Sequence, residues 1–373
     1  MFKKIYNRFE PGPLGRKFGD FIVQRSAPFE KTVVSEFPTT RFYGSKRKQL
    51  GWLAEEFSRL NVRTALDAFG GTGAVSFLMD ALGWEVTYND IFEFNSISAK
   101  AIFSDSTLKF KKNHLIDFLE KVELRAGFIS ATFDELYFTK EENSWLDGIM
   151  YEISLLDESP RNLILYLVFQ ACLKKRPFNL FHRANLHLRT SSMPVKFGNR
   201  TTWNKTFSSH IISAYEELQI SQSAKVPSIC VNEAGCAKNV NGSFDLVYLD
   251  PPYFKLKKRN TDTYLQRYHF LEGLARFNEW GSLIDYSLPQ RSLRSPYRGE
   301  LTNKYELVAD LKEMFINHPN SKFALSYVSG EAPKEEELFD LFRGQFDKVR
   351  LSRRNYNKVL SNKSSAEILI IGQ

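Results

Sequence analysis

The stretch VYLDPPYF at residues 247–254 holds the residue types best suited to chemistry. Strand-forming residues precede Asp250. Pro251 and Pro252 then end the strand and stiffen the turn, because proline fixes φ and lacks a backbone donor. The turn therefore presents a carboxylate on one side and the ring of Tyr253 on the other. The alternative is a proline-rich strand exit with an ordinary tyrosine, which the glycine-rich stretch FGGTG earlier in the chain makes less attractive.

The turn suits an exocyclic amine on an aromatic ring, such as the amino group of adenine. The lone pair of such an amine is delocalised into the ring, so its nitrogen is a poor nucleophile. The carboxylate of Asp250 and the carbonyl of Pro251 can each accept one N–H bond, which localises the lone pair for attack on a methyl group. Tyr253 offers a face for stacking. This chemistry needs a base taken out of its duplex, and it needs no histidine and no metal.

A second candidate site is the glycine turn in LDAFGGTGAV, residues 66–75. Its glycines follow a short apolar strand ending at Asp67 and precede a helix, so the backbone can turn tightly and a ligand can approach it. Asp90 ends the next strand, where a carboxylate can bind ribose hydroxyls or cap the following helix. A turn of this kind can bind NAD, FAD or S-adenosylmethionine, or it can be a structural turn that binds no ligand. Because Ser76 replaces the third glycine of the dinucleotide pattern, a cofactor without a pyrophosphate fits better.

Both turns belong to an α/β pattern. A strand, a turn, a helix and a strand over residues 62–90 predict the start of a doubly wound sheet. The alternation resumes at PSICVNEAG and FDLVYL and ends in two strands typical of a β-hairpin. The helical stretch between is too long for a loop. We therefore predict an arm over 1–40, a catalytic domain over 41–105 and 225–373, and an inserted domain over 106–224.

Composition sets limits on the class of protein. The 373 residues are 43% hydrophobic and 25% charged, which is typical of globular proteins. The net charge of +8 and the pI of about 9.1 suit a polyanionic partner, although many cytosolic proteins are mildly basic. Three cysteines argue against a disulfide framework and favour the reducing cytoplasm. The sequence has no apolar run long enough to span a membrane and no signal peptide core, so we expect no membrane partner.

Several stretches, in order, resemble the Dam-like D12 (alpha) class of DNA adenine N6-methyltransferases. They are RFYGSKRKQL (41–50), AFGGTG (68–73), YNDIFEFN (88–95), DPPY (250–253), SYVSG (326–330) and the YNKVLS…EILIIG ending. The resemblance implies a class I S-adenosylmethionine-dependent methyltransferase fold, with a mostly parallel seven-stranded sheet and a C-terminal β-hairpin. It also implies that the insertion between the cofactor and catalytic motifs recognises the target sequence.

The resemblance further implies roles for individual residues. Asp250, Pro251, Pro252 and Tyr253 would hold the adenine. Residues contacting S-adenosyl-L-methionine would be Tyr43, Gly44, Lys46, Asp67, Phe69, Gly71, Gly73, Asp90 and Glu233. Glu233 is assigned from VNEAG as the acidic residue after the third strand, and Asn232 is an alternative.

The insertion holds a basic and aromatic stretch, RPFNLFHRANLHLRT. Arginine and asparagine suit contacts with guanine and adenine edges, and arginine also binds phosphate. We therefore expect DNA contacts from Arg176, Asn179, His182, Arg183, Asn185 and Arg189 and, after the turn of residues 250–253 (the catalytic turn), from Lys255, Lys257 and Lys258. For any one of these residues, a solvated loop or a structural role is the alternative. We interpret His269, which lies on a predicted helix, as structural.

The sequence therefore predicts transfer of a methyl group from S-adenosylmethionine to adenine N6 in double-stranded DNA at one short sequence, with a possible cognate restriction or defence nuclease as partner. An RNA adenine methyltransferase could use the same turn, although a large insertion at this position favours DNA. A catalytically silent DNA-binding module is the third alternative, and the intact DPPY and FGGTG motifs argue against it.

Overall fold

The computed structural model describes residues 37–39, 44–105, 110–191, 200–222, 227–255, 263–357 and 364–373. A seven-stranded sheet with the order β3-β2-β1-β4-β5-β7-β6 forms its centre. The strands are β1 (Thr64–Asp67), β2 (Glu85–Tyr88), β3 (Ile229–Val231), β4 (Leu246–Leu249), β5 (Lys322–Val328), β6 (Val349–Asn357) and β7 (Ser364–Gly372). Neighbours among β1 to β5 pair in parallel, while β7 pairs antiparallel with β5 and β6. This confirms the predicted fold class and the C-terminal hairpin.

The central strands are apolar because helices cover both faces of the sheet. All four residues of β4 are buried, and alternate side chains enter different cores. Tyr248 packs with α3 (Leu50–Phe57), α4 (Ala74–Ala81) and α5 (Glu93–Ile102). Val247 and Leu249 pack with α16 (Lys304–Asn317) and α17 (Glu335–Arg343).

The register of the sheet brings the two predicted motifs to one edge. Asp67, the last residue of β1, is opposite Tyr248 of the parallel strand β4. The glycine turn begins at Ala68, directly after Asp67, and the Asp-Pro-Pro-Tyr turn begins at Asp250, two residues after Tyr248. Because carboxyl ends of adjacent parallel strands share an edge, the turns become neighbours, and ligands of open α/β sheets bind at such edges.

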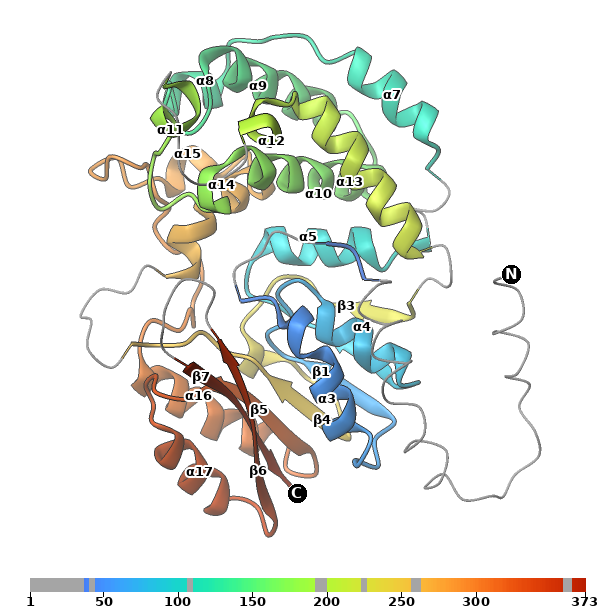
Figure 1. Cartoon of the computed structure of the whole chain (residues 1–373), viewed down its shortest axis with the longest axis vertical. Coiled ribbons are helices and arrows are strands. Elements are labelled where there is room, and N and C mark those ends of the chain that lie inside the picture. The colour runs from blue at the N-terminus through green and yellow to red at the C-terminus, as the bar shows by residue number, and fades with distance from the viewer. Residues whose placement is uncertain are drawn as a thin grey trace, which may run out of the picture.

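A layer of helices lies beyond α5, away from the sheet (Figure 1). It contains α7 (Lys112–Glu120), α8 (Phe128–Thr132), α9 (Lys140–Ser154), α10 (Glu158–Lys175), α11 (His187–Thr190), α12 (Arg200–Asn204) and α13 (Phe207–Gln222). The apolar helix α10 is buried and contacts both α5 and α13. None of the described helices is both long and apolar enough to cross a bilayer.

Two helices that follow β4 also join this layer. They are α14 (Tyr264–Ala275) and α15 (Trp280–Leu283). The buried ring of Trp280 lies 5.4 Å from Phe128 and 5.0 Å from Phe133, measured between ring centroids. The helical layer therefore extends beyond the segment 106–224, and the division of the chain into domains stays a prediction.

Candidate active site

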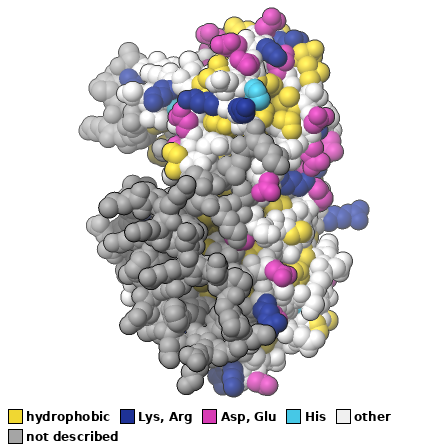
Figure 2. Space-filling model, turned by 90° about the vertical axis from the view of Figure 1, so that its right-hand side faces the viewer, with side chains coloured by type: hydrophobic (Ala, Val, Ile, Leu, Met, Phe, Trp, Pro, Cys, Tyr) yellow, Lys and Arg dark blue, Asp and Glu magenta, His cyan; other side chains and the backbone are white. Residues whose placement is uncertain are grey.

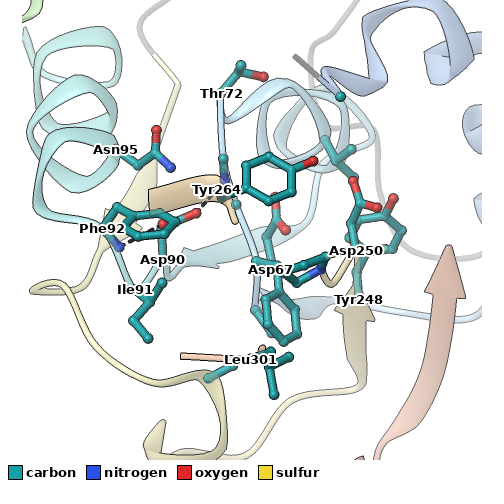
Figure 3. A pocket seen from close by; sticks show the side chains of 18 of the residues that line it. Asp67, Thr72, Asp90, Ile91, Phe92, Asn95, Tyr248, Asp250, Tyr264 and Leu301 are labelled. Atoms are coloured by element: carbon teal, nitrogen blue, oxygen red, sulfur yellow. Dashed lines mark hydrogen bonds between the residues drawn. The ribbon is translucent and has the colours of Figure 1, made fainter. Parts of the chain in front are cut away.

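One cavity joins the two turns at the carboxyl edge of the sheet (Figure 3). Its open volume, including adjoining solvent, is about 970 Å³. Its lining includes Phe69, Gly71, Asp90, Asp250, Pro252 and Tyr264. The glycine turn and the Asp-Pro-Pro-Tyr turn, which the sequence separates widely, therefore open into the same space.

The glycine turn depends on its lack of side chains. Gly71 and Gly73 adopt φ values of +51° and +78°, in the left-handed region that favours glycine. A Cβ atom on Gly70 would lie 2.1 Å from the ring of Tyr88. The Gly73 N–H donates to the Gly70 carbonyl at 2.8 Å, and the Gly71 N–H donates to Oδ2 of Asp90 at 2.9 Å. The turn is thus tight, and its backbone borders the cavity.

Asp90 connects β2 to this turn. Its Oδ1 accepts the Phe92 N–H at 2.9 Å, so the carboxylate holds the backbone on both sides of the cavity edge. Burial raises the pKa of Asp90, and the hydrogen bonds from Phe92, Asn95 and Gly71 oppose that rise. Asp90 therefore holds the backbone before α5 but does not cap this helix, whose N-cap residue is Phe92, and the contact with a ribose stays a prediction.

Asp67 places an unpaired carboxylate oxygen beside the cavity. The side chain is buried, and its Oδ2 accepts the Ser76 hydroxyl at 2.6 Å. Its Oδ1 has no hydrogen-bond partner within the described residues. Burial, together with the charges of Asp250 and Asp90, raises the pKa of Asp67 to about 7. Since an unpaired buried carboxylate is costly, this oxygen is suited to a cationic group of a ligand.

The carboxylate of Asp250 is held by a lysine and a tyrosine. Nζ of Lys46, in the 3-10 helix η2 (Lys46–Gln49), lies 3.0 Å from Oδ1 of Asp250. The Tyr253 hydroxyl donates to the same oxygen at 2.7 Å. Lys46 also contacts the carboxylate of Glu367 on β7. The lysine that the sequence places near the cofactor thus lies against the predicted catalytic aspartate.

The charges in this cluster are coupled. Burial raises the pKa of Asp250, Lys46 lowers it, and the like charge of Glu367 raises it again, leaving it above the usual value. Burial lowers the pKa of Lys46, but its ion pairs with Asp250 and Glu367 outweigh burial and leave that pKa raised. The ammonium of Lys46 is therefore retained between the two carboxylates.

The sequence reasoning missed two residues of the site. Tyr264, at the start of α14, lines the cavity between the two turns (Figure 3). It lies in the tyrosine-bearing segment after the catalytic turn, but nothing in the sequence marks this tyrosine over its neighbours. Glu367 is the other, and its signal was one acidic residue inside the apolar strand AEILIIG.

The other predicted cofactor residues differ in their positions. Gly44 and Phe69 line the cavity, while Tyr43 lies outside the described residues. Glu233 does not fit its predicted role, because its side chain is exposed and pairs with Lys100 at 2.6 Å. Beyond β3, the cavity wall is formed by Cys236 and Ala237.

Arg176 does not fit the predicted contact with DNA. Its side chain is 0% exposed, and its guanidinium donates to the backbone carbonyls of Tyr137, Leu180, Arg183 and Ala184. It also lies over the rings of Tyr137 and Phe181. Through these contacts the guanidinium holds the loop that follows α10. Arg176 is therefore a buried structural residue of this loop and not the DNA contact expected from the sequence.

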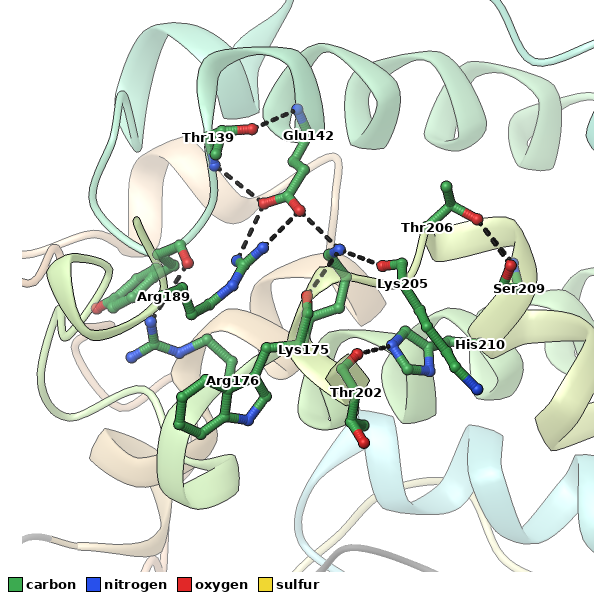
Figure 4. A network of polar contacts seen from close by, with 12 residues as sticks. Thr139, Glu142, Lys175, Arg176, Arg189, Thr202, Lys205, Thr206, Ser209 and His210 are labelled. Atoms are coloured by element: carbon green, nitrogen blue, oxygen red, sulfur yellow. Dashed lines mark hydrogen bonds and ion pairs between the residues drawn. The ribbon is translucent and has the colours of Figure 1, made fainter. Parts of the chain in front are cut away.

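Arg189 is likewise committed within the protein (Figure 4). Its guanidinium forms a bidentate pair with Glu142 at 2.6 and 3.0 Å, and Lys175 joins the same carboxylate at 2.7 Å. Glu142 also accepts the Thr139 N–H at the start of α9. Because Arg189 is buried in this network, its role is also structural, and the DNA contact expected from the sequence is wrong for this residue.

The remaining predicted DNA contacts stay predictions. Arg183 and Lys255 are exposed, and Asn179, His182 and Asn185 are partly buried on the loop that Arg176 holds. Lys257 and Lys258 lie outside the described residues. On the face shown in Figure 2, acidic and basic side chains are interspersed over the helical layer, a mixture typical of a solvated surface. That face therefore does not add to the argument for a DNA contact.

His269 is structural, as expected. It is fully buried on α14, and its Nε2 lies 2.9 Å from the Tyr137 hydroxyl and 3.2 Å from the Phe181 carbonyl. Burial lowers its pKa to about 3, so the ring is neutral.

Comparison with known proteins agrees with the geometry. The chain is 25% identical over 314 residues to the type II methyltransferase M2.HphI of Haemophilus parahaemolyticus, covering 81% of this chain and 87% of that protein. It is 22% identical over 338 residues to the type II methyltransferase M.NlaIII of Neisseria lactamica, covering 84% and 92%. The family described as D12 class N6 adenine-specific DNA methyltransferase matches residues 42–275, which include both turns. The chain therefore belongs to this family and is a site-specific, adenine-specific DNA methyltransferase.

Proposed function

We propose that the cavity binds S-adenosylmethionine on the glycine turn and an adenine, flipped out of duplex DNA, against the turn from Asp250 to Tyr253. The observation that carries this proposal is the single cavity lined by both turns. A duplex base cannot present its amine to such an enclosed edge, so the adenine must leave the base stack.

The residues present fit the cofactor. Asp67 has a buried oxygen with no partner in the described part of the chain, which suits the ammonium of the methionine moiety. Gly71 keeps the backbone open at the cavity edge, and Asp90 lies on the neighbouring strand end, where ribose hydroxyls bind in this architecture. When bound, S-adenosylmethionine supplies an electrophilic methyl group on a sulfonium sulfur.

The protein prepares the amine for attack. Oδ2 of Asp250 and the carbonyl of Pro251 accept the two N–H bonds of adenine N6 and draw its lone pair out of conjugation. In the transfer, N6 would form the N–CH₃ bond as the S–CH₃ bond breaks with its electron pair left on sulfur, and the proton released from N6 would pass to the Asp250 carboxylate and from there to solvent. The carboxylate of Asp250 stabilises the positive charge that develops on this nitrogen.

We further propose that the enzyme acts within a restriction–modification or defence system. Both curated relatives carry type II methyltransferase names. A nuclease that cuts the same short sequence would be the functional partner, and methylation by this enzyme would protect the host DNA from it.

The test is methylation of unmethylated genomic DNA by the purified protein with radiolabelled S-adenosylmethionine, followed by long-read sequencing that detects modified bases. We expect N6-methyladenine at one short motif in duplex DNA. The Asp250→Ala variant should lose transfer and still bind S-adenosylmethionine in calorimetry. Transfer to RNA alone, or an active Asp250→Ala variant, would refute the proposal.

A further inference from the structure

Glu367 is a buried carboxylate that the mechanism above does not use. It lies on β7 between apolar residues, and it is 2% exposed. Its strand partners are Val328 on β5 and Arg354 on β6. A charged side chain in such a strand is costly unless it is well paired, so its contacts indicate what it does.

Three polar groups from different segments meet at one oxygen of Glu367. Oε1 accepts from the Ser326 hydroxyl at 3.1 Å, lies 3.2 Å from the Tyr253 hydroxyl, and contacts Nζ of Lys46. The segments that supply these groups are η2, β5 and the catalytic turn. Glu367 thus connects β7 to the two groups, Lys46 and Tyr253, that contact Oδ1 of Asp250.

The ammonium of Lys46 has a partner for each of its three protons. Nζ contacts Oδ1 of Asp250, Oε1 of Glu367 and the Tyr253 hydroxyl. With the lysine donating to its oxygen, Tyr253 is free to direct its own proton to Oδ1 of Asp250 at 2.7 Å. Both donors therefore bind Oδ1, and Oδ2 takes part in neither contact.

We propose that Glu367 is a positioning residue for methyl transfer. It anchors Lys46, which together with Tyr253 fixes Oδ1 of Asp250 and leaves Oδ2 to accept the adenine amine. The inference rests on the proposed role of Asp250. An unanchored lysine would rotate toward either oxygen of Asp250, and a misplaced acceptor slows an oriented reaction by about 100-fold for a shift near 1 Å.

The test compares Glu367→Gln with a matched variant at another buried carboxylate. Glu56 on α3 is also buried, and it pairs with Arg350 and accepts the Ser352 hydroxyl at 2.8 Å on β6. It does not belong to the cavity lining. We expect Glu367→Gln to slow single-turnover transfer to unmethylated genomic DNA about 10- to 100-fold with little change in cofactor affinity. Glu56→Gln should keep the wild-type rate, although it should lose about as much thermal stability as Glu367→Gln.

A pH profile separates positioning from general destabilisation. The charged and titratable groups that surround Asp250 are Lys46, Tyr253, Glu367, Asp67 and Tyr248. Removing the negative charge of Glu367 makes Asp250 easier to ionise. The acid limb of the single-turnover rate should therefore move to lower pH in Glu367→Gln, and Glu367→Asp should restore part of the rate.

The outcomes are distinct. A wild-type rate and pH profile in Glu367→Gln would overturn the inference, as would equal losses of rate in Glu56→Gln and Glu367→Gln. Asp250→Asn is assayed in parallel. If Asp250→Asn is active, the proposed function of the catalytic turn fails. If Asp250→Asn is inactive while Glu367→Gln matches the wild type, only the role of Glu367 is refuted.

Discussion

The ammonium of Lys46 lies 3.0 Å from Oδ1 of Asp250, so the segment before the first strand supplies the countercharge of the catalytic turn. The same ammonium contacts Glu367. Without it, two carboxylates would remain buried next to each other, and each would favour the protonated form of the other. The lysine therefore keeps Asp250 ionised as well as oriented.

Lys46→Met should shift the pH dependence of transfer in the opposite direction to Glu367→Gln. Loss of the cation raises the pKa of Asp250 further, so the acid limb of the single-turnover rate should move to higher pH. At neutral pH we expect a loss of more than about 100-fold, typical of removing a charged group at a reaction centre. Lys100→Met is the control, because Lys100 pairs with the exposed Glu233 outside the cavity. An unchanged acid limb in Lys46→Met would contradict this account.

Gly71→Val should obstruct the cofactor. Gly71 lines the cavity at φ +51°, where a β-branched side chain is strained and would occupy the cofactor edge. We expect affinity for S-adenosylmethionine, measured by calorimetry, to fall at least about tenfold, which corresponds to about 1.4 kcal/mol.

Gly83→Val supplies the matched control for backbone strain. Gly83 also has a positive φ, +87°, and a Cβ there would meet open space after α4. Both variants should lose similar stability, by about 1–3 kcal/mol. If both variants weaken cofactor binding equally, strain rather than obstruction is the cause, and the cofactor assignment of Gly71 loses its support.

The sequence could predict the fold and much of the site because these depend on local patterns. A strand ending in Asp67 and a strand ending before Asp250 are both visible as apolar runs, and parallel strands place their carboxyl ends at one edge. Helix and strand order then follow from the alternation of segments. The shared cavity follows from the topology of the sheet, and the local sequence patterns were enough to predict that topology.

The remaining features depend on contacts between distant segments. Nothing local pairs Lys46 with Glu367 on the last strand, or places α14 and α15 on the helices before β3. Arg176 shows the same limit in another form. Arginine among aromatic and polar residues is typical of a DNA contact, but its guanidinium can equally bind backbone carbonyls of a loop, and only the folded chain decides between the two.

The affinity for S-adenosylmethionine should depend on pH through Asp67. Burial raises the pKa of this carboxyl to about 7, so it titrates near neutral pH in the free protein. A ligand ammonium binds the ionised form, so affinity should rise between pH 6 and about pH 7.5, below the range in which an α-ammonium itself loses its proton. Calorimetry across this range measures the effect. Asp67→Asn should bind more weakly and lose this pH dependence, whereas a wild-type profile in Asp67→Asn would exclude Asp67 as the partner of the ammonium.

Arg176 and Arg183 should have opposite phenotypes although they lie on the same loop. Arg176→Met leaves several buried carbonyls without donors, so the free energy of unfolding should fall by about 3 kcal/mol or more, measured by denaturant unfolding. Arg183 is exposed, so Arg183→Gln should keep its stability, weaken DNA binding and reduce the dependence of affinity on salt by about one counterion. Binding titrations over a range of salt concentrations test this. An unchanged salt dependence in Arg183→Gln would remove this residue from the DNA interface, and a stable Arg176→Met variant with weakened DNA binding would return Arg176 to it.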